Sequence, residues 1–471
     1  MGITIAGLGP GAWGQVTLDV HAALEQAQEL YLRTGRHPAV AHLPGHLTVH
    51  SFDDLSARAG SLEGARRAIV EQVWTLGQQP QGVLYGVPGH PLVGEATVRE
   101  LLARGRDSGL PCRVLSGLSF VEPALVALEV DALEAGLQVV DALHPRVEPD
   151  RPALLARVEH RRLAAAVKRA LLEVYPPAHR VTVVQGAGTP QERTHAIAVA
   201  ALDDWPDWDG LTCLYVPALG LDDNVATLEG VRRIVERLRA PGGCPWDREQ
   251  THESLKPYLL EEAYEALHAL DEGDMAKLAE ELGDLLMNVL IQAQIAAESG
   301  EFTVHDMCRA VGEKLIRRHP HVFGTAHART AQEVLANWEL LKAQERRAEE
   351  SALAGIPHAM PALAYSRTML AKAGRLGVHL EAVAGANPAH PLRAALEQCP
   401  PPERLRRLGE TLLGLVDLSE RLALDPEEAL RLANGRFRRR FMALEAAARQ
   451  EGREIADLPP PTIRDLWQSQ E

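Results

Sequence analysis

The chain is poor in aromatic residues and cysteines and has no long apolar run. Aromatic side chains make up 4% of its 471 residues, and the five cysteines are scattered, with no Cys-x-x-Cys pair. Neither a zinc site nor a disulfide scaffold is therefore indicated. No stretch is apolar enough to cross a membrane, and residues 1–5 predict a strand rather than a signal peptide. We expect a globular protein of the reduced cytoplasm.

The charge balance is acidic, with a formal net charge of -15. This excess argues against general nucleic-acid binding, although it leaves room for a local basic pocket. Hydrophobic residues at 46% and charged residues at 24% are ordinary for a globular protein. The length predicts two or three domains.

Acidic residues recur at helical spacing in the stretch 244–323. Glu262 and Glu265 are three residues apart, as are Glu281 and Asp284, so each pair lies on one face of a helix. We expect two antiparallel helices whose acidic residues face each other. Four carboxylates at one place repel one another unless a cation neutralises them, and oxygen ligands select Mg²⁺ or Mn²⁺. The alternative is two solvated acidic faces.

Turn signals and apolar stripes define these two helices. Gly273 is expected to end the first helix and Asp274 to cap the second. Each helix also carries an apolar stripe on one face. The stripes comprise Leu259, Leu260, Ala263, Leu267 and Leu270 on the first helix, and Leu278, Leu282, Leu285, Leu286 and Val289 on the second.

Three motifs surround the two helices. They are G-G-C-P-W-D-R-E-Q-T-H at 242–252, E-K-L-I-R-R-H-P-H-V-F at 313–323 and N-W-E-L-L-K at 337–342. Together with the acidic pairs, they cover about residues 238–345 and resemble the MazG family of nucleoside triphosphate pyrophosphohydrolases. One departure is that a residue is missing between Lys314 and the two arginines.

The resemblance implies roles for individual residues. Glu262, Glu265, Glu281 and Asp284 match the metal ligands, and Glu261 matches a carboxylate beside them that could activate water. The positions around the nucleotide and its phosphates, with further substrate-binding candidates, are Lys314, Arg318, Trp338, Lys342, Trp246, Lys256 and Asn288. Lys314 and Arg318 would stabilise the charge that develops in the reaction. The implied reaction is metal-dependent hydrolysis between the α- and β-phosphates, of the house-cleaning type, which releases a nucleoside monophosphate and pyrophosphate.

Some of these residues have a simpler interpretation. Trp246 and Trp338 could stack on a base or could fill a core. Lys256 could reach a phosphate or could be a solvated lysine in the first turn of its helix. His319 and His321 are expected to end a helix rather than to bind metal.

Residues 1–222 predict an α/β region of mainly parallel sheets covered by helices, because short apolar strands alternate with helical stretches. The predicted strands are 3–6, 82–85, 113–115, 137–140, 181–184 and 212–216. A glycine-rich turn with Gly7, Gly9 and Gly11 follows the first strand. It is either a tight turn or a place where a helix N-terminus receives a polar cofactor.

Other stretches agree with one known pattern. They are Y-L-R-T at 31–34, Y-G-V-P-G-H-P at 85–91, S-G-L-S at 116–119 and G-A-G-T at 186–189. With the glycine-rich turn, they make nearly all of the first 220 residues similar to the tetrapyrrole (corrin/porphyrin) methylases, which bind S-adenosylmethionine between two α/β subdomains. The resemblance implies a cofactor site at Gly7, Gly9, Gly11, Pro88, Gly89, His90, Ser116 and Gly117.

One departure from the methylase pattern concerns the acidic residue of its Gly-Asp-Pro motif. The chain has Val87 at that position, between Gly86 and Pro88. Cofactor binding through backbone groups is still expected, but the missing carboxylate disfavours methyl transfer. His90, just beyond, could be a general base or could cap its own loop.

The last part of the chain contains a faint internal repeat. Residues 408–413 are similar in sequence to 282–287, and residues 434–441 are similar to 312–319. Arg407 stands where Glu281 would be, so we predict a degenerate second MazG-like unit with a structural role. Its arginine run at 436–440 is either a phosphate patch or a solvated helix face. MazG-like units complete a four-helix arrangement by pairing, so we expect a homodimer through the C-terminal half.

We therefore predict a multidomain protein. An α/β domain at 1–222 precedes an all-α MazG-like catalytic domain at 223–351 and a degenerate all-α unit at 352–471. The predicted function is nucleoside triphosphate hydrolysis with Mg²⁺ or Mn²⁺, and S-adenosylmethionine is a candidate ligand of the first domain. The alternatives are an S-adenosylmethionine-dependent methyltransferase and a regulator that binds nucleotide or S-adenosylmethionine.

Overall fold

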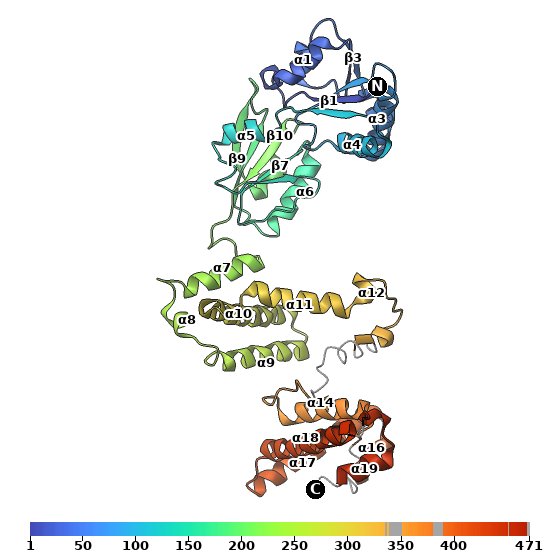
Figure 1. Ribbon diagram of the computed structural model, residues 1–471. Coiled ribbons are helices and arrows are strands. Elements are labelled where there is room, and N and C mark those ends of the chain that lie inside the picture. The colour runs from blue at the N-terminus through green and yellow to red at the C-terminus, as the bar shows by residue number, and fades with distance from the viewer. Residues whose placement is uncertain (335–336, 339–350, 380–389, 451, 469–471) are drawn as a thin grey trace. The chain divides into compact units, whose positions relative to one another are not determined.

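The computed structural model describes residues 1–334, 337–338, 351–379, 390–450 and 452–468. The chain forms two compact units, 1–310 and 311–471. Figure 1 labels their helices and strands. An α/β part and a group of helices make up the first unit, and the described part of the second unit is helical. The predicted fold class is confirmed, whereas the domain boundaries after residues 222 and 351 stay predictions.

The first sheet is parallel throughout, with strand order β3-β2-β4-β1-β5. Its strands are β1 (Ile3–Gly7), β2 (Glu29–Leu32), β3 (Thr48–Ser51), β4 (Val83–Val87) and β5 (Cys112–Leu115). The segments between them form α1 (Leu18–Gln26), α2 (Asp53–Arg58), α3 (Leu62–Gly77), α4 (Ala96–Ser108) and the 3₁₀ turns η1 (Trp13–Gln15) and η2 (Pro38–His42). Ile3 and Ile5 of β1 and Tyr85 and Val87 of β4 are buried, so the central strands carry the core.

The second sheet is mostly antiparallel, with strand order β6-β7-β10-β8-β9. Its strands are β6 (Gln138–Asp141), β7 (Ala153–Ala156), β8 (Arg180–Gln185), β9 (Arg193–Ala198) and β10 (Thr212–Val216), accompanied by α5 (Val121–Leu128), α6 (Arg161–Leu172) and η3 (Val199–Asp204). Only β6 and β7 pair in parallel. The prediction of mainly parallel sheets is therefore wrong for this half. A short turn joins β8 to β9, which suits antiparallel strands, whereas parallel strands need a long crossover.

Four strands were not predicted from the sequence: β2, β3, β7 and β9. β2 and β3 have only four residues each, and the Ala-Leu-Leu-Ala of β7 suits a helix equally well. β9 is largely exposed at the edge of its sheet. Pairing with neighbouring strands, rather than their own pattern, makes these segments strands.

The helices of the first unit include the predicted antiparallel pair. They are α7 (Leu228–Arg239), α8 (Pro245–Glu249), α9 (Lys256–Glu272), α10 (Met275–Ser299) and the start of α11 (Val304–Arg318). Between α9 and α10, Gly273 adopts a left-handed φ of 72°, and the Asp274 side chain accepts hydrogen bonds from the N–H groups of Ala276 and Lys277. Both predicted caps are thus confirmed, and α9 packs against α10.

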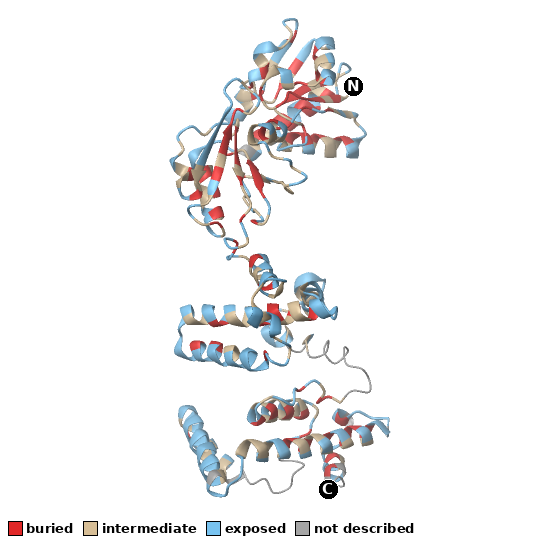
Figure 2. Cartoon of the chain, turned by 90° about the vertical axis from the view of Figure 1, so that its left-hand side faces the viewer, coloured by how far each residue is buried: buried red, intermediate tan, exposed pale blue. Residues whose placement is uncertain are grey.

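The apolar stripe of α9 stays largely exposed within one chain (Figure 2). On α9, Leu260, Leu267 and Leu270 are each more than half exposed, while Ala266 and Ala269 are buried. The two helices therefore touch through small alanine side chains beside the stripe. The leucines are left for some other contact.

The second unit has its own hydrophobic core. Its described elements are the end of α11, α12 (Pro320–Phe323), α14 (Ala362–Arg375), α16 (His390–Glu397), α17 (Pro401–Arg421), α18 (Pro426–Gln450), η4 (Ile455–Asp457) and α19 (Pro460–Gln468). The core includes Met369 of α14, Phe437 and Phe441 of α18 and Trp467 of α19. Among the residues described in either unit, no helix is both long and apolar enough to cross a membrane.

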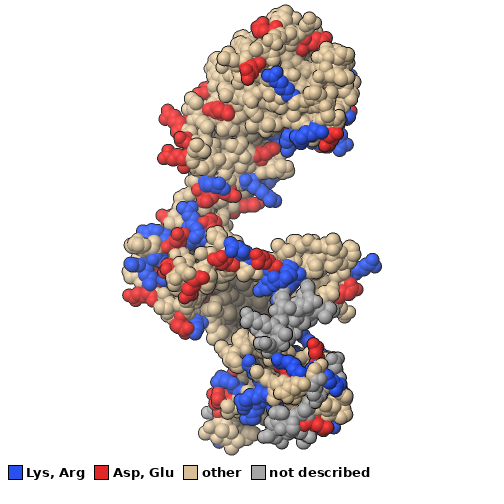
Figure 3. Space-filling view, viewed as in Figure 1, with Lys and Arg blue, Asp and Glu red and all other residues tan. Residues whose placement is uncertain are grey.

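The arginine run of α18 takes part in this packing. Phe437 within the run is buried, and Arg438 donates a hydrogen bond to the Tyr365 hydroxyl at 3.1 Å. Arg438 therefore packs within the protein and is not part of a fully solvated helix face. On the face that Figure 3 shows, basic and acidic side chains are interspersed. Within α7, Arg232 forms ion pairs with Glu229 and Glu236.

Two glycines of the α/β part, Gly7 and Gly117, are required by close backbone packing. A Cβ atom on Gly117, just after β5, would lie 2.5 Å from the carbonyl oxygen of Gly89 and 2.6 Å from that of Gly7. A Cβ atom on Gly7 would lie 2.6 Å from the same Gly89 oxygen. These contacts are with backbone atoms, which cannot rotate away. The glycines therefore let three chain segments meet at the carboxyl ends of the strands.

Replacing Gly117 by alanine should lower the free energy of unfolding of the α/β part by about 2–3 kcal/mol, because the new methyl group overlaps two carbonyl oxygens. Chemical denaturation followed by circular dichroism measures this change. Gly45→Ala is the control, since a Cβ atom there meets nothing within 4 Å and should change stability by less than about 1 kcal/mol. Equal stability of the two variants would contradict the role of Gly117 in packing.

Candidate functional site

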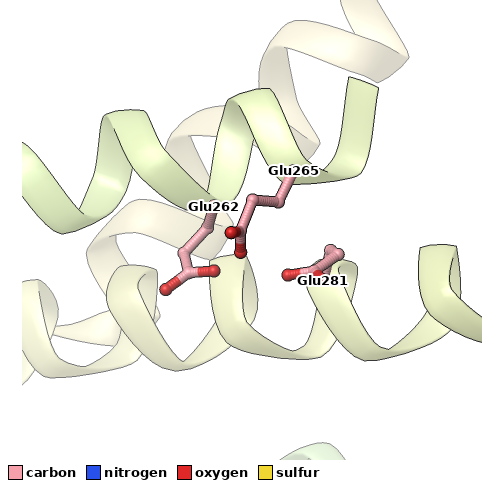
Figure 4. Close-up of side chains that lie close together, drawn as sticks. All are labelled: Glu262, Glu265 and Glu281. Atoms are coloured by element: carbon pink, nitrogen blue, oxygen red, sulfur yellow. The ribbon is translucent and has the colours of Figure 1, made fainter. Parts of the chain in front are cut away.

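Three carboxylates from α9 and α10 converge on one place. Glu262 and Glu265 of α9 point toward Glu281 of α10 (Figure 4). One oxygen of each residue can be chosen so that all three lie within 4.8 Å of one another. The helical turn at Gly273 folds the two helices together, and the three-residue spacing puts both α9 carboxylates on the side that faces α10.

The electrostatics of this carboxylate triad follow from its crowding. Partial burial and then the charge of Asp284 raise the pKa of Glu262. The charge of Glu281 raises the pKa of Glu265. Glu281 itself is only 3% exposed, and a hydrogen bond from Lys277 lowers its pKa. The Lys277 Nζ lies 2.9 Å from Glu281 Oε1, one helical turn away.

This donor set fits a hard divalent cation. Three carboxylate oxygens within reach of one another are the ligands that Mg²⁺ and Mn²⁺ prefer. The neighbouring negative charges contribute to the raised pKa values of Glu262 and Glu265, and a cation would offset them. Asp284 is near enough to affect the pKa of Glu262 but lies outside the triad. As a fourth metal ligand it stays a prediction.

Three other predicted site residues, Glu261, Asn288 and Trp246, differ in their exposure and contacts. Glu261 is exposed on α9. Asn288 is buried, and its side-chain amide donates to the backbone oxygen of Asp284 at 3.1 Å. Trp246 is half exposed and stands edge-on to Tyr258, with ring centroids 6.1 Å apart, so it is not a core residue.

Lys256 begins α9, and most of the remaining predicted residues lie in the second unit. Lys256 pairs with Glu253 in the first turn of α9 and is exposed, which agrees with the solvated alternative. Lys314 and Arg318 lie in the last two turns of α11, and Trp338 is half-buried, all within the second unit. His319 donates from its ring to the Leu315 oxygen at 2.7 Å, as expected for a residue that ends a helix. Lys342 lies outside the described residues.

A second candidate site is a cleft of about 570 Å³ in the α/β part. Its lining includes Pro88, Gly89 and His90 of the predicted cofactor site. The lining also comes from both sheets, with Arg33 and Glu95 on one side and Arg157 on the other. The size suits a small-molecule ligand, for which pockets of roughly 300–1,000 Å³ are usual.

The other predicted cofactor residues do not line this cleft. They are Gly7, Gly9, Gly11, Ser116 and Gly117. Gly7 and Gly117 instead serve the close backbone packing described above. The Leu92 N–H donates to His90 Nδ1 at 3.1 Å, so His90 caps its own loop. Val87, in place of the acidic motif residue, is fully buried in the core.

The cleft passes one test for a polar ligand. His37 lines it and is 93% buried, and its Nδ1 has no hydrogen-bond partner within the part of the chain that the structure describes. Buried polar atoms are nearly always paired, so a ligand group is a reasonable partner here. A ligand with a hydroxyl or amino hydrogen, such as S-adenosylmethionine, can supply the donor that this one nitrogen lacks.

Sequence reasoning missed Lys277, His37, Arg33 and Glu95. Lys277 precedes Glu281 by four residues, which is the spacing of a helical ion pair, so that signal was available. His37 and Glu95 carry no such local signal. Their importance depends on burial and on partners far away in the sequence.

Two family models match parts of this chain. Residues 250–323 match the model of the MazG nucleotide pyrophosphohydrolase domain, and residues 2–203 match that of the tetrapyrrole (corrin/porphyrin) methylases. The chain is 34% identical over 477 residues to the uncharacterized protein YabN of Bacillus subtilis, covering 99% of this chain and 97% of YabN.

Named relatives cover the C-terminal half. The nucleoside triphosphate pyrophosphohydrolase/pyrophosphatase MazG of Thermotoga maritima is 41% identical over 238 residues, covering 50% of this chain and 92% of that protein. The nucleoside triphosphate pyrophosphohydrolase of Escherichia coli K12 is 38% identical over 253 residues, covering 50% and 93%. Among solved structures, uroporphyrin-III-C-methyltransferase from Thermus thermophilus is 22% identical with a TM-score of 0.36, covering 48% of this chain and 94% of that one.

Replacing Lys277 by methionine should make the helical part depend more on metal. The substitution removes the positive charge beside Glu281, so the midpoint of thermal unfolding without metal should fall by a few degrees. Added Mg²⁺ should then raise the midpoint more than in the unmodified protein, because the cation replaces the lost charge. Scanning calorimetry in EDTA and in Mg²⁺ measures both effects.

Lys168→Met is the matched control. Lys168 Nζ lies 2.6 Å from Asp203 Oδ1 in the α/β part, so this variant also loses a lysine–carboxylate pair. Its response to Mg²⁺ should equal that of the unmodified protein. A Lys277→Met variant that behaves like the control would show that Lys277 is only a helical ion pair.

Proposed function

Because the chain belongs to the family of YabN and joins a tetrapyrrole methylase domain to a MazG nucleotide pyrophosphohydrolase domain, we propose that it hydrolyses nucleoside triphosphates to a nucleoside monophosphate and pyrophosphate. The observation that carries the proposal is the carboxylate triad of Glu262, Glu265 and Glu281. The names of the relatives that match the C-terminal half support the same activity, which would remove nucleotides in a house-cleaning role.

The metal site of this proposal consists of the triad and Asp284. A bound Mg²⁺ or Mn²⁺ would neutralise phosphate charge and lower the pKa of a water molecule. The two α9 ligands and Glu281 would be held in place by the packing of α9 on α10. Lys277 is the competing cation, because it occupies an oxygen of Glu281 that the metal site needs.

The chemistry assigned to the chain's own residues is proton transfer and charge stabilisation. A water oxygen adds to phosphorus, the anhydride bond between the α- and β-phosphates breaks, and pyrophosphate leaves. Glu261, exposed beside the triad, would accept the proton of the water. The roles of Lys314, Arg318, Trp338 and Lys342 at the nucleotide, and those of Trp246, Lys256 and Asn288, rest on the sequence pattern alone.

A second candidate function belongs to the α/β part. The cleft with its unpartnered His37 nitrogen favours binding of S-adenosylmethionine there, either for methyl transfer or as a regulatory ligand. The buried Val87 in place of a motif carboxylate favours binding over methyl transfer. We therefore place hydrolysis first.

A homodimer is part of the proposal. Within one chain, Leu260, Leu267 and Leu270 of α9 expose more than half of their surface, and a pair of helices is not a complete bundle. A second copy that packs against this face would bury the leucines and build a four-helix arrangement. The apolar character of the exposed face supports the dimer.

Glu262→Gln should reduce the rate of hydrolysis on the order of a hundredfold or more, since it removes one charged ligand of the triad. The rate is measured with each ribo- and deoxyribonucleoside triphosphate, with and without Mg²⁺, and the products are identified. Glu272→Gln, at the exposed end of α9, should be fully active. Diphosphate and free phosphate as products, or full activity of Glu262→Gln with normal circular dichroism, would refute the proposal.

Light scattering at micromolar concentration should give twice the chain mass of 51.3 kDa. Leu267→Glu should shift the protein toward the monomer, because a charge on the exposed apolar face opposes burial. Leu133→Glu, at an isolated exposed leucine of the α/β part, should leave the mass unchanged. A monomeric mass for the unmodified protein would rule out the dimer.

A further inference from the structure

The cleft of the α/β part contains a histidine whose protonation is set by its contacts. His37 directly precedes η2, is 7% exposed and lines the cleft. Its Nε2 lies 2.9 Å from the carbonyl oxygen of Gly9. A carbonyl oxygen only accepts, so Nε2 carries the proton and donates it. Burial lowers the pKa of His37, which keeps the ring neutral with a single proton.

The other ring nitrogen is then an acceptor with nothing to accept from. Nδ1 of a neutral ring with its proton on Nε2 carries a lone pair. It is buried, and none of the residues for which coordinates are described donates to it. The ring cannot rotate to satisfy Nδ1 without giving up the contact with Gly9. The unpaired atom therefore points to a donor that is not part of the chain.

The surroundings of His37 belong to the ligand cleft. Gly9, which the ring holds, forms a β-bridge with Gly89, and Gly89 lines the cleft beside Pro88. The glycine-rich turn and the turn after β4 are thus connected to one buried histidine. A role in the ligand cleft explains why a polar ring is buried at this place.

Charged groups of both sheets complete the polar lining. Arg33 Nε lies 2.9 Å from Glu95 Oε1, and the Glu95 side chain is mostly buried. Across the cleft, Arg157 pairs with Asp141 and holds a left-handed φ of 65°, which is strained for a residue with a Cβ atom. Strain of this kind is kept where the surroundings or a function require the conformation. The lining can thus meet a ligand that carries both charges and hydrogen-bond donors.

We propose that His37 is a specificity-determining residue of this cleft, where its Nδ1 accepts a hydrogen bond from a hydroxyl or amino group of an adenosyl ligand with an amino-acid tail. The inference rests on the second candidate function, that this part of the chain binds S-adenosylmethionine. It is independent of hydrolysis by the helical part. His37 acts by hydrogen bonding and forms no covalent bond with the ligand.

The test is calorimetric titration of the full chain with S-adenosylhomocysteine. His37→Gln keeps an amide N–H that can reach the Gly9 oxygen but removes the acceptor at the Nδ1 position. Its affinity should fall about tenfold, the usual effect of one lost hydrogen bond in a binding site. His37→Asn places an amide oxygen near the Nδ1 position and should bind more tightly than His37→Gln. His46→Gln, an exposed histidine of the same connection, should bind like the unmodified protein.

Each outcome supports or overturns the inference. Equal affinity of His37→Gln and the unmodified protein would show that His37 only holds the glycine-rich turn. No binding of S-adenosylhomocysteine by the unmodified protein would reject the adenosyl ligand and the inference with it. If circular dichroism shows that His37→Gln does not fold, the test uses His37→Asn alone. An affinity of His37→Asn equal to that of the unmodified protein then supports the inference, and a lower affinity overturns it.

Nucleotide hydrolysis measured on the same samples separates this inference from the main proposal. Hydrolysis without binding of S-adenosylhomocysteine rejects only the role of His37. Binding that is sensitive to His37→Gln without hydrolysis supports this inference and rejects the main proposal.

Discussion

Mutual repulsion of carboxylates between two packed helices is the constraint on which the helical part depends. α9 and α10 would separate if the triad charges were the only force between them. Three features oppose this: the capped turn at Gly273 and Asp274, the small contact residues Ala266 and Ala269, and the cation of Lys277 on Glu281. A divalent cation would complete the compensation, so stability and metal binding are linked at this place.

The same arrangement explains why the apolar stripe of α9 stays exposed. The faces of α9 and α10 that meet must be narrow enough to bring carboxylates together, and alanines allow that close approach. Larger side chains such as Leu260 and Leu267 then lie to the side of the contact. A helix pair built around charges cannot also bury a wide apolar face against itself, which is the physical reason for expecting a second copy.

The α/β part combines a polar cleft with tightly packed strand ends. Gly7 and Gly117 let their backbone segments meet the backbone of Gly89, and this contact leaves no room for a side chain at Gly7 or Gly117. Polar groups are therefore supplied from neighbouring loops, by His37, Arg33 and Glu95. Val87, which stands where the methylase motif has a carboxylate, is part of the hydrophobic core. A valine suits that buried position.

The sequence by itself determined the features that depend on neighbours along the chain. Helical spacing placed Glu262 beside Glu265, Gly273 and Asp274 marked the turn, and the motifs indicated both domains, because each of these signals is local. Only the tertiary structure decided which carboxylates meet, that the second sheet is mostly antiparallel, and that His37 holds Gly9 with an unpaired nitrogen left over. These outcomes depend on burial and pairing between residues far apart in the sequence, which no local pattern records.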